Sequence, residues 1–150
     1  MEDIRKYRTF AKNITDMAIK IINAKQFATK LKVTIQKSGR LGFTEETANI
    51  LDLSSGKYAK FAKDDENGML YLIIINNEED EAFQIKSSSG YYYVPAKLMF
   101  DMLGFDYEHN NVMFDLVRQF SLDEELQGQV FKMLPRINKR KEKDDEIENK

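Results

Sequence analysis

A Ser-Gly pair followed by a short apolar strand and a helical stretch occurs twice in this chain, and this repetition constrains the fold more than any other feature. The first copy begins at Ser38-Gly39 and the second at Ser89-Gly90, 51 residues later. Glycine at such positions gives the backbone the freedom that tight turns need. Self-similarity at a fixed separation is typical of an internal repeat. We therefore predict two related units, over residues 31–75 and 82–118.

The first unit combines strand, turn and helix patterns. Apolar and β-branched residues at Val33–Ile35 predict a strand, and residues 44–53 predict a helical turn after a second short strand. A hairpin is expected from Tyr58 to Ile75, turning at Asn67-Gly68, because Asn-Gly favours tight hairpin turns. The apolar run over residues 69–75 predicts a strand that is buried on both faces and lies at the centre of the sheet.

The second unit follows the same order. Strands are predicted at Phe83–Ile85 and Tyr91–Val94, and a helix at residues 95–103, with proline in its first turn and Gly104 as its stop signal. A last strand is predicted at Val112–Val117. Alternation along a strand places only two of the residues Tyr91, Tyr92 and Tyr93 on one face, and core or cross-strand packing is the favoured use of these rings.

The N-terminal stretch from Asp3 to Ala24 has apolar or small residues at alternating spacings of three and four. This spacing predicts an amphipathic helix, whose stripe consists of Ile4, Tyr7, Ala11, Ile14, Ala18 and Ile21. Further apolar residues widen the stripe, which favours packing against the domain over a dimer seam. No secretory signal pattern is present, and no apolar run approaches the ~20 residues that span a bilayer.

The C-terminal part predicts one more helix and then a tail. Ser121 and Glu124 have capping-box spacing, and Pro135 ends the predicted helix. Residues 136–150 carry mixed charge with almost no apolar residue, which predicts a disordered tail. The predicted fold is therefore α+β: one domain over residues 1–135, with an N-terminal helix and link over 1–30 and a mostly antiparallel sheet or small barrel built from two related halves.

Composition excludes several chemistries. The 150-residue chain has no cysteine, so disulfides and thiolate sites are excluded and a cytoplasmic location is expected. His109, the only histidine, has no second ligand of its kind beside it, so a structural or exposed role is favoured. The acidic run at residues 78–81 lacks calcium-loop spacing and predicts a solvated turn. No nucleophile, acid/base or phosphate-loop motif is present, so we expect no enzyme activity, no cofactor and no small-molecule substrate.

Charge is distributed unevenly along the chain. Residues 1–40 hold ten Lys or Arg against three Asp or Glu, whereas residues 41–135 hold seven against seventeen. A basic first quarter on an acidic body is compatible with an anion-binding face and equally with a solvated helix surface.

The residues around Arg40 resemble those of the AbrB/MazE-type (SpoVT-AbrB) swapped-hairpin domain. The similarity consists of the strand Val33–Ile35, the run Gly39-Arg40-Leu41-x-Phe43, a short helix, and Leu51-x-Leu53 with Gly56 after it. The second unit is similar through Gly90 to Pro95 and through Leu103-Gly104-Phe105. Each copy departs from the family pattern, because Thr44 stands where the family has proline and Tyr91 where it has arginine.

The resemblance implies a small interleaved barrel that binds double-stranded DNA as a transcription regulator or antitoxin, normally as a homodimer. Two fused copies imply a pseudo-dimer. The positions that match the DNA-facing ones are Lys37 and Arg40, with Lys32 and Lys30 as neighbours. Two alternatives remain: a protein-interaction or structural domain of similar shape, and a single-stranded nucleic-acid binder that uses the tyrosines.

Overall fold

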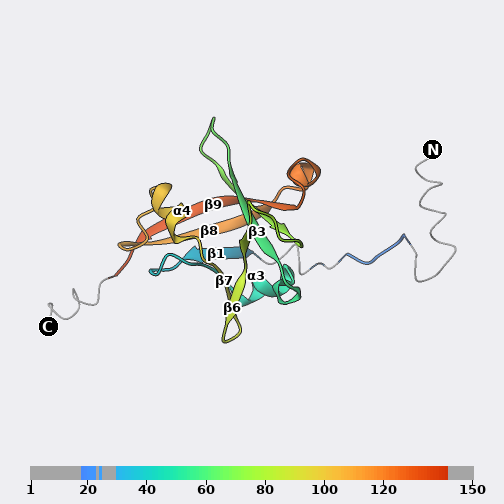
Figure 1. The fold of residues 1–150 in the computed structure, drawn as a ribbon, viewed down its shortest axis with the longest axis horizontal. Helices are drawn as coiled ribbons and strands as arrows, with labels where there is room; N and C mark the ends of the chain where they lie inside the picture. The colour runs from blue at the N-terminus through green and yellow to red at the C-terminus, as the bar shows by residue number, and fades with distance from the viewer. Residues whose placement is uncertain (1–17, 23, 25–29, 142–150) are drawn as a thin grey trace.

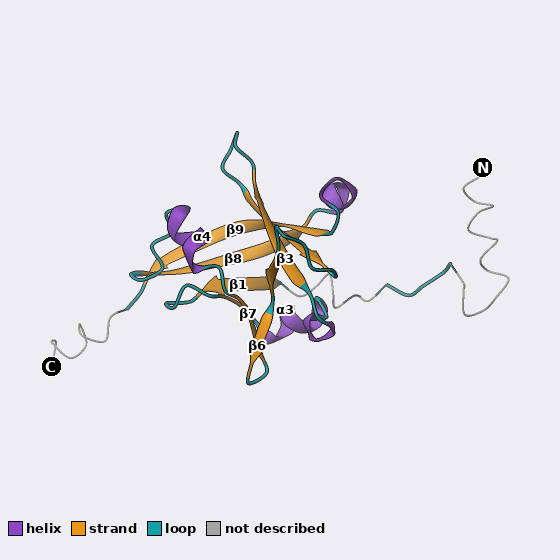
Figure 2. Cartoon of the chain, in the orientation of Figure 1, coloured by secondary structure: helices purple, strands orange, loops and turns teal. Residues whose placement is uncertain are grey.

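The computed structural model describes residues 18–22, 24 and 30–141, and its dominant feature is one antiparallel sheet of nine strands (Figures 1 and 2). The strand order is β5-β3-β4-β9-β8-β1-β2-β7-β6. The strands are β1 (Leu31–Ile35), β2 (Leu41–Phe43), β3 (Tyr58–Lys63), β4 (Leu70–Ile75), β5 (Phe83–Gln84), β6 (Lys86–Ser88), β7 (Tyr91–Val94), β8 (Asn110–Arg118) and β9 (Gln129–Lys139).

Short helical segments connect these strands. They are α3 (Glu45–Ile50), η2 (Leu53–Ser55), α4 (Lys97–Met102), η3 (Phe120–Leu122) and α5 (Asp123–Leu126). Thr44 caps α3, because its side-chain oxygen accepts the Thr47 backbone N–H at 3.2 Å. Within the described part of the chain, no helix is long and apolar enough to cross a membrane.

The two outermost strands in this order, β5 and β6, are consecutive in sequence and nearly close the sheet into a barrel. β5 pairs with β3, and β6 pairs with β7. Ile85 joins the two strands, and its backbone N–H donates to the Lys57 carbonyl at 3.2 Å. One bent stretch over residues 83–88 therefore satisfies two sheet edges that would otherwise present unpaired backbone groups.

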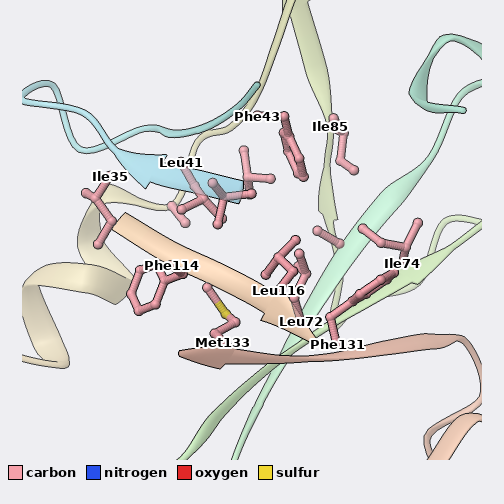
Figure 3. Close-up of a cluster of buried hydrophobic side chains, with 14 of the residues drawn as sticks. Ile35, Leu41, Phe43, Leu72, Ile74, Ile85, Phe114, Leu116, Phe131 and Met133 are labelled. Atoms are coloured by element: carbon pink, nitrogen blue, oxygen red, sulfur yellow. The ribbon is translucent and has the colours of Figure 1, made fainter. Parts of the chain in front are cut away.

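Alternating side chains fill the barrel (Figure 3). Val33 and Ile35 of β1 are fully buried, while Lys32 and Thr34 face outward with partial exposure. The same alternation buries Val112, Phe114 and Leu116 of β8. Full burial of each such side chain contributes about 1.5–3 kcal/mol.

β4 is buried on both faces, as its continuous apolar run predicts. Leu72 and Ile74 belong to the barrel core, whereas Ile73 and Ile75 form a second cluster with Val130 on the outside of the sheet. Leu122 and Leu126 pack against that outer cluster. The η3–α5 segment therefore covers an apolar patch that would otherwise face water.

The two halves of the chain, residues 31–75 and residues 83–139, pair their strands by the same scheme. The β1–β2 hairpin corresponds to β6–β7, and β3–β4 corresponds to β8–β9. The pairing of β1 with β8 corresponds to that of β5 with β3. β2 pairs with β7, its counterpart in the other half, and β4 likewise pairs with its counterpart β9. Strands of each half thus pair with strands of the other half, and the sheet is completed only by both halves together.

The predicted α+β class is wrong, because the fold is mostly antiparallel β. The three α-helices described have six, six and four residues, too few to form a layer on the sheet. The predicted N-terminal helix falls mainly outside the described residues. Of its described residues, 18–22 and 24, residues 18–22 are not helical, and Ile19, Ile21 and Ile22 are exposed. Apolar spacing without a packing partner is weak support for a helix in water.

The C-terminal boundary also differs from the prediction. β9 runs to Lys139, four residues into the predicted tail, and residues 142–150 lie outside the described part. The predicted helix after Ser121 is only the short α5, which begins at Asp123. The sequence pattern did not indicate this part of β9, because its charged side chains lie at exposed positions. Its strand conformation comes from the backbone of residues 136–139, which pairs with Asn110–Met113.

Two positions in the left-handed region end α3 and α4, and they hold different residues. Gly104 has φ +83°, and Asp52 has φ +53°. We expect Gly104→Ala to destabilise the protein by about 1–2 kcal/mol, because a Cβ is unfavourable in this region even where space is open. Asp52→Gly should be neutral or stabilising. Urea denaturation measures both, and equal effects of the two substitutions would contradict this account.

The C-terminal end of β9 gives a second prediction. A chain that ends at Pro135 loses the β8–β9 pairing of residues 136–139 and the hydrogen bonds of Arg140. We expect a loss of about 2 kcal/mol or more, because each hydrogen bond contributes about 0.5–1.5 kcal/mol net. Thermal melts should show this loss, while a chain that ends at Lys141 should melt like the full chain. Equal melting of both truncated chains would show that this strand end is dispensable.

Candidate nucleic-acid interface

The turn between β1 and β2 holds two of the predicted site residues, Lys37 and Arg40. The Gln36 N–H donates to the Arg40 carbonyl at 2.7 Å, and the Gly39 N–H donates to the Gln36 carbonyl at 2.8 Å. These bonds fix a tight turn that projects from the end of the barrel. Both side chains are outside the core, and none of the ion pairs within the described part of the chain includes them.

Gly39 allows this turn to lie directly against α4. Its φ is +91°, and a Cβ built on it would be 2.5 Å from Cγ of Lys97. The close approach brings a third cation beside the turn. Lys37 and Lys97 line a cavity of about 220 Å³, together with Asp101, Phe105, Asp106, Tyr107 and Glu108.

Arg40 is held against the neighbouring strand β7. Its guanidinium carbon lies 4.1 Å from the centroid of the Tyr93 ring, within the range of a cation–π contact. Tyr91 stacks beside Tyr93, with 6.4 Å between the ring centroids. As alternation predicts, these two rings share the outer face, whereas Tyr92 packs against the core. The stack restricts the orientation of Arg40 while its charge stays at the surface.

Tyr91 also has a structural task. A Cβ on Gly42 would be 2.5 Å from the Tyr91 hydroxyl and 2.4 Å from Nε2 of Gln36. The two side chains therefore cover the gap that glycine leaves in β2. This cross-strand packing is the use that the sequence favours for the tyrosines.

The end of β9 adds further basic residues to the same end of the barrel. The register places Ile35 of β1 opposite Val112 of β8, and Val112 opposite Ile137 of β9. The β1–β2 turn and the last residues of β9 thus leave the sheet at the same end, with β8 between their strands. Lys139, Arg140 and Lys141 continue the chain there, at positions that the sequence prediction assigned to a tail.

Arg140 fastens this end to the loop after α4. Its guanidinium donates to the Tyr107 carbonyl at 2.9 and 3.1 Å and to Oδ1 of Asn111 at 2.8 Å. Its backbone N–H donates to the His109 carbonyl. Lys139 and Lys141 are exposed. Arg140 is therefore mainly structural, and the two lysines remain accessible to a ligand.

Carboxylates offset part of the positive charge at this end. Lys97 pairs with Asp101 at 3.0 Å, and the Tyr107 hydroxyl donates a short hydrogen bond to the same carboxylate. The Tyr107 bond first, and Lys97 second, hold the pKa of Asp101 below its ordinary value. The same hydrogen bond raises the pKa of Tyr107, and Asp101 raises the pKa of Lys97. Lys97 thus retains its charge, which Asp101 partly neutralises.

The structure separates the other two predicted residues from the turn. Lys30 precedes β1, so the strand's rise places it roughly 20 Å from Lys37. Lys32 lies at mid-strand opposite Asp115, and its backbone N–H donates to Oγ1 of Thr47. Lys37 and Arg40 therefore share one end of the barrel, whereas Lys30 lies at the opposite end.

His109 pairs with Asp106 in the exposed loop after α4, with Nδ1 3.1 Å from Oδ1. The backbone N–H of His109 is the first cause that lowers the pKa of Asp106. Among the described residues, no group of three or more His, Asp or Glu side chains is placed to hold a metal ion.

A larger polar cavity, about 450 Å³, lies near the start of β9, where the sequence suggested no site. Its lining includes Lys57, Asn76, Glu79, Arg118, Asp123 and Gln127. Lys57 donates to Oδ1 of Asn76 at 2.8 Å. Arg118 donates to both oxygens of Asp123 at 2.6 and 2.8 Å, which lowers the pKa of Asp123. Asp123 also accepts the Val130 N–H at 3.1 Å. The bonds of Asp123 fix η3–α5 to the sheet, so we assign them a structural role.

Comparison with protein-family models, curated proteins and solved structures found no match for this chain. The resemblance to AbrB/MazE-type domains therefore stays a prediction.

The Asp101–Tyr107 bond gives a prediction for pH dependence. Tyr107→Phe removes the main cause of the low Asp101 pKa, so we expect that pKa to rise toward its ordinary value. Because the pKa is depressed in the folded protein, the carboxylate stabilises the fold above its unfolded-state pKa, and this stability is lost as pH falls through the folded-state pKa. The substitution should weaken that acid dependence.

Carboxyl NMR titration of the native and Tyr107→Phe proteins measures the change. Asp106 serves as an internal control, because His109 and not Tyr107 lowers its pKa. An unchanged Asp101 pKa in the variant would show that the hydroxyl does not hold this carboxylate.

Proposed function

We propose that this protein binds double-stranded DNA without catalysing a reaction, and that it acts as a regulator of the transcription-factor or antitoxin kind. The binding surface is the basic end of the barrel, which we define as Lys37, Arg40, Lys97, Lys139 and Lys141. A cytoplasmic location, expected from the cysteine-free sequence, is part of the same proposal.

One observation carries this proposal: three segments that are distant in sequence bring their cations to one end of the barrel. The turn contributes Lys37 and Arg40, α4 contributes Lys97, and the end of β9 contributes two lysines. Phosphate contacts by Lys and Arg supply most of the sequence-independent affinity for DNA. Arg40, steadied by Tyr93, presents the planar donor group that suits phosphate or guanine.

Charge elsewhere supports one orientation on DNA. The acidic residues Asp123, Glu124 and Glu125 lie in α5, a few residues before β9, and the eleven residues of β9 place Lys139 roughly 35 Å from its start. A polyanion is attracted to one end of this strand and repelled from the other. The two ends of β9 thus differ in the sign of the charged side chains beside them.

The exchanged strand pairing also supports the proposal. The AbrB/MazE resemblance implies an interleaved barrel of two copies, and here the first strand of each half pairs with the other half's strand after the helix. The second turn, Ser88–Tyr91, contains no charged residue. Of the two turns, only the first is therefore assigned to the DNA-binding surface. A homodimer, which would provide two such turns, stays a prediction.

A protein-interaction function is the second candidate, and one observation favours it. Leu98 and Met102 are 77% and 85% exposed. They lie four residues apart, and hence on the same face, of α4. Exposed apolar side chains on a short helix suit a protein partner better than a phosphate backbone. A single-stranded nucleic-acid binder is less favoured, because Arg40 covers the Tyr93 ring and Tyr91 covers Gly42.

Charge reversal at the turn tests the DNA-binding function. We expect Lys37→Glu with Arg40→Glu to abolish binding to a mixed-sequence duplex in fluorescence anisotropy. Lys37→Gln alone should lower the slope of log affinity against log salt by about 0.9, the value for one phosphate contact. Both positions are exposed, so stability should change by only about 0.5 kcal/mol or less.

The matched control is Lys30→Glu with Lys63→Glu, which makes the same change in net charge away from the turn. Circular dichroism verifies the fold of each variant. Equal losses in the two double variants would refute a site at the turn. A native protein that selects no duplex from genomic fragments, while Leu98→Ser blocks capture of a protein partner, would replace DNA binding with protein interaction.

A further inference from the structure

An apolar groove of about 240 Å³ lies at the opposite end of the barrel, where β1 begins. Its lining is Leu31, Ile50, Leu51, Arg118, Phe120, Gln129 and Phe131. These residues come from β1, the end of α3, the end of β8, the β8–β9 connection and the start of β9. Leu31, Leu51 and Phe131 are buried, but the Phe120 side chain is 59% exposed. The groove therefore offers a large aromatic surface that the described residues leave uncovered.

The wall that carries Phe120 is held in place by Arg118. The Arg118 guanidinium carbon lies 4.2 Å from the Phe120 ring centroid and 5.3 Å from that of Phe131. The same guanidinium is bound by both oxygens of Asp123. A stacked and doubly hydrogen-bonded guanidinium keeps the exposed ring from collapsing onto the sheet. The groove is thus preformed, which lowers the entropy cost of docking a segment there.

The chain itself carries uncovered apolar side chains shortly before Leu31 in the sequence. Ile19, Ile21 and Ile22 are 81%, 97% and 74% exposed. In Figure 1 their segment stands clear of the barrel, on the side where α3 lies. The sequence leads from this segment to Leu31, which lines the groove. Both surfaces are apolar, and both lack a partner in the described structure.

The connection between them is long enough for docking within one chain. Nine residue steps separate Ile22 from Leu31, and an extended chain of this length spans up to about 30 Å. A tether of so few residues raises the effective concentration of the segment at the groove, up to the order of millimolar. A free partner at micromolar concentration, including a second copy of this chain, would compete poorly with it.

We propose that the segment Ala18–Ile22 docks into the Phe120 groove of its own chain, with Ile19 and Ile21 against the groove. The described segment is not helical, and alternate residues of an extended segment lie on the same side. This arrangement makes the groove an attachment site for the N-terminal segment. It does not depend on DNA binding at the basic end.

Disulfide trapping tests the proposal cleanly, because the chain has no cysteine of its own. The test chain is full length with Ile21→Cys and Phe120→Cys, and the control chain has Ile21→Cys and Leu98→Cys. Leu98 is also highly exposed, but it lies on α4 at the basic end. Under mild oxidation we expect the intramolecular disulfide to form at least tenfold faster in the test chain. Non-reducing gels and peptide mass analysis identify the product.

Equal rates in the two chains would overturn the docking. A disulfide that joins two chains, at a rate that rises with protein concentration, would replace the chain's own segment with that of a second copy. A second test pair, Ile21→Cys with Gln129→Cys, reaches the same groove from β9 in case the Phe120 variant folds poorly. It should cross-link as fast as the first pair, and a rate equal to the control would also refute the proposal.

Discussion

Closure of the sheet by residues 83–88 is the constraint on which the rest of the fold depends. This stretch pairs with β3 on one side and with β7 on the other, and Ile85 is 8% exposed at the bend between them. Without it, β3 and β7 would be edge strands with unpaired backbone groups. The two edges come from different halves of the chain. Closing the barrel therefore also fixes how the halves interleave. The β5–β3 pairing that closes it has its counterpart in the β1–β8 pairing.

This interleaving decides where charged side chains from distant segments can come together. A turn in an isolated hairpin would project alone, but the β1–β2 turn lies against α4 and at the same end of the barrel as the end of β9, both from the other half of the chain. Gly39 permits the first contact, because any side chain there would collide with Lys97. The barrel can thus place charged groups from distant segments together while its core stays apolar.

The sequence predicts local elements better than it predicts their assembly. Apolar alternation and turn residues located β1, β7 and the β3–β4 hairpin, because period-two patterns and Asn-Gly act over a few residues. β9 was missed because its outer half carries exposed charges, and its strand conformation comes from pairing with β8. The predicted N-terminal helix does not extend over residues 18–22, since an amphipathic stripe needs a matching surface. At the candidate site, the sequence identified Lys37 and Arg40, but Lys97, Lys139 and Tyr93 join them only through tertiary contacts.

The two halves share a pairing scheme but not a chemistry. Where the first turn has Lys37 and Arg40, the second has serines and Tyr91, and where α4 ends at Gly104, α3 ends at Asp52. The strand pairing requires only backbone bonds and inward apolar residues, so outward positions are free to differ between the halves. Tyr93 and Lys97, from the second half, contact Arg40 and Gly39 of the first. The second half thus supports a basic turn that it does not itself possess, and a symmetric scaffold acquires one basic end.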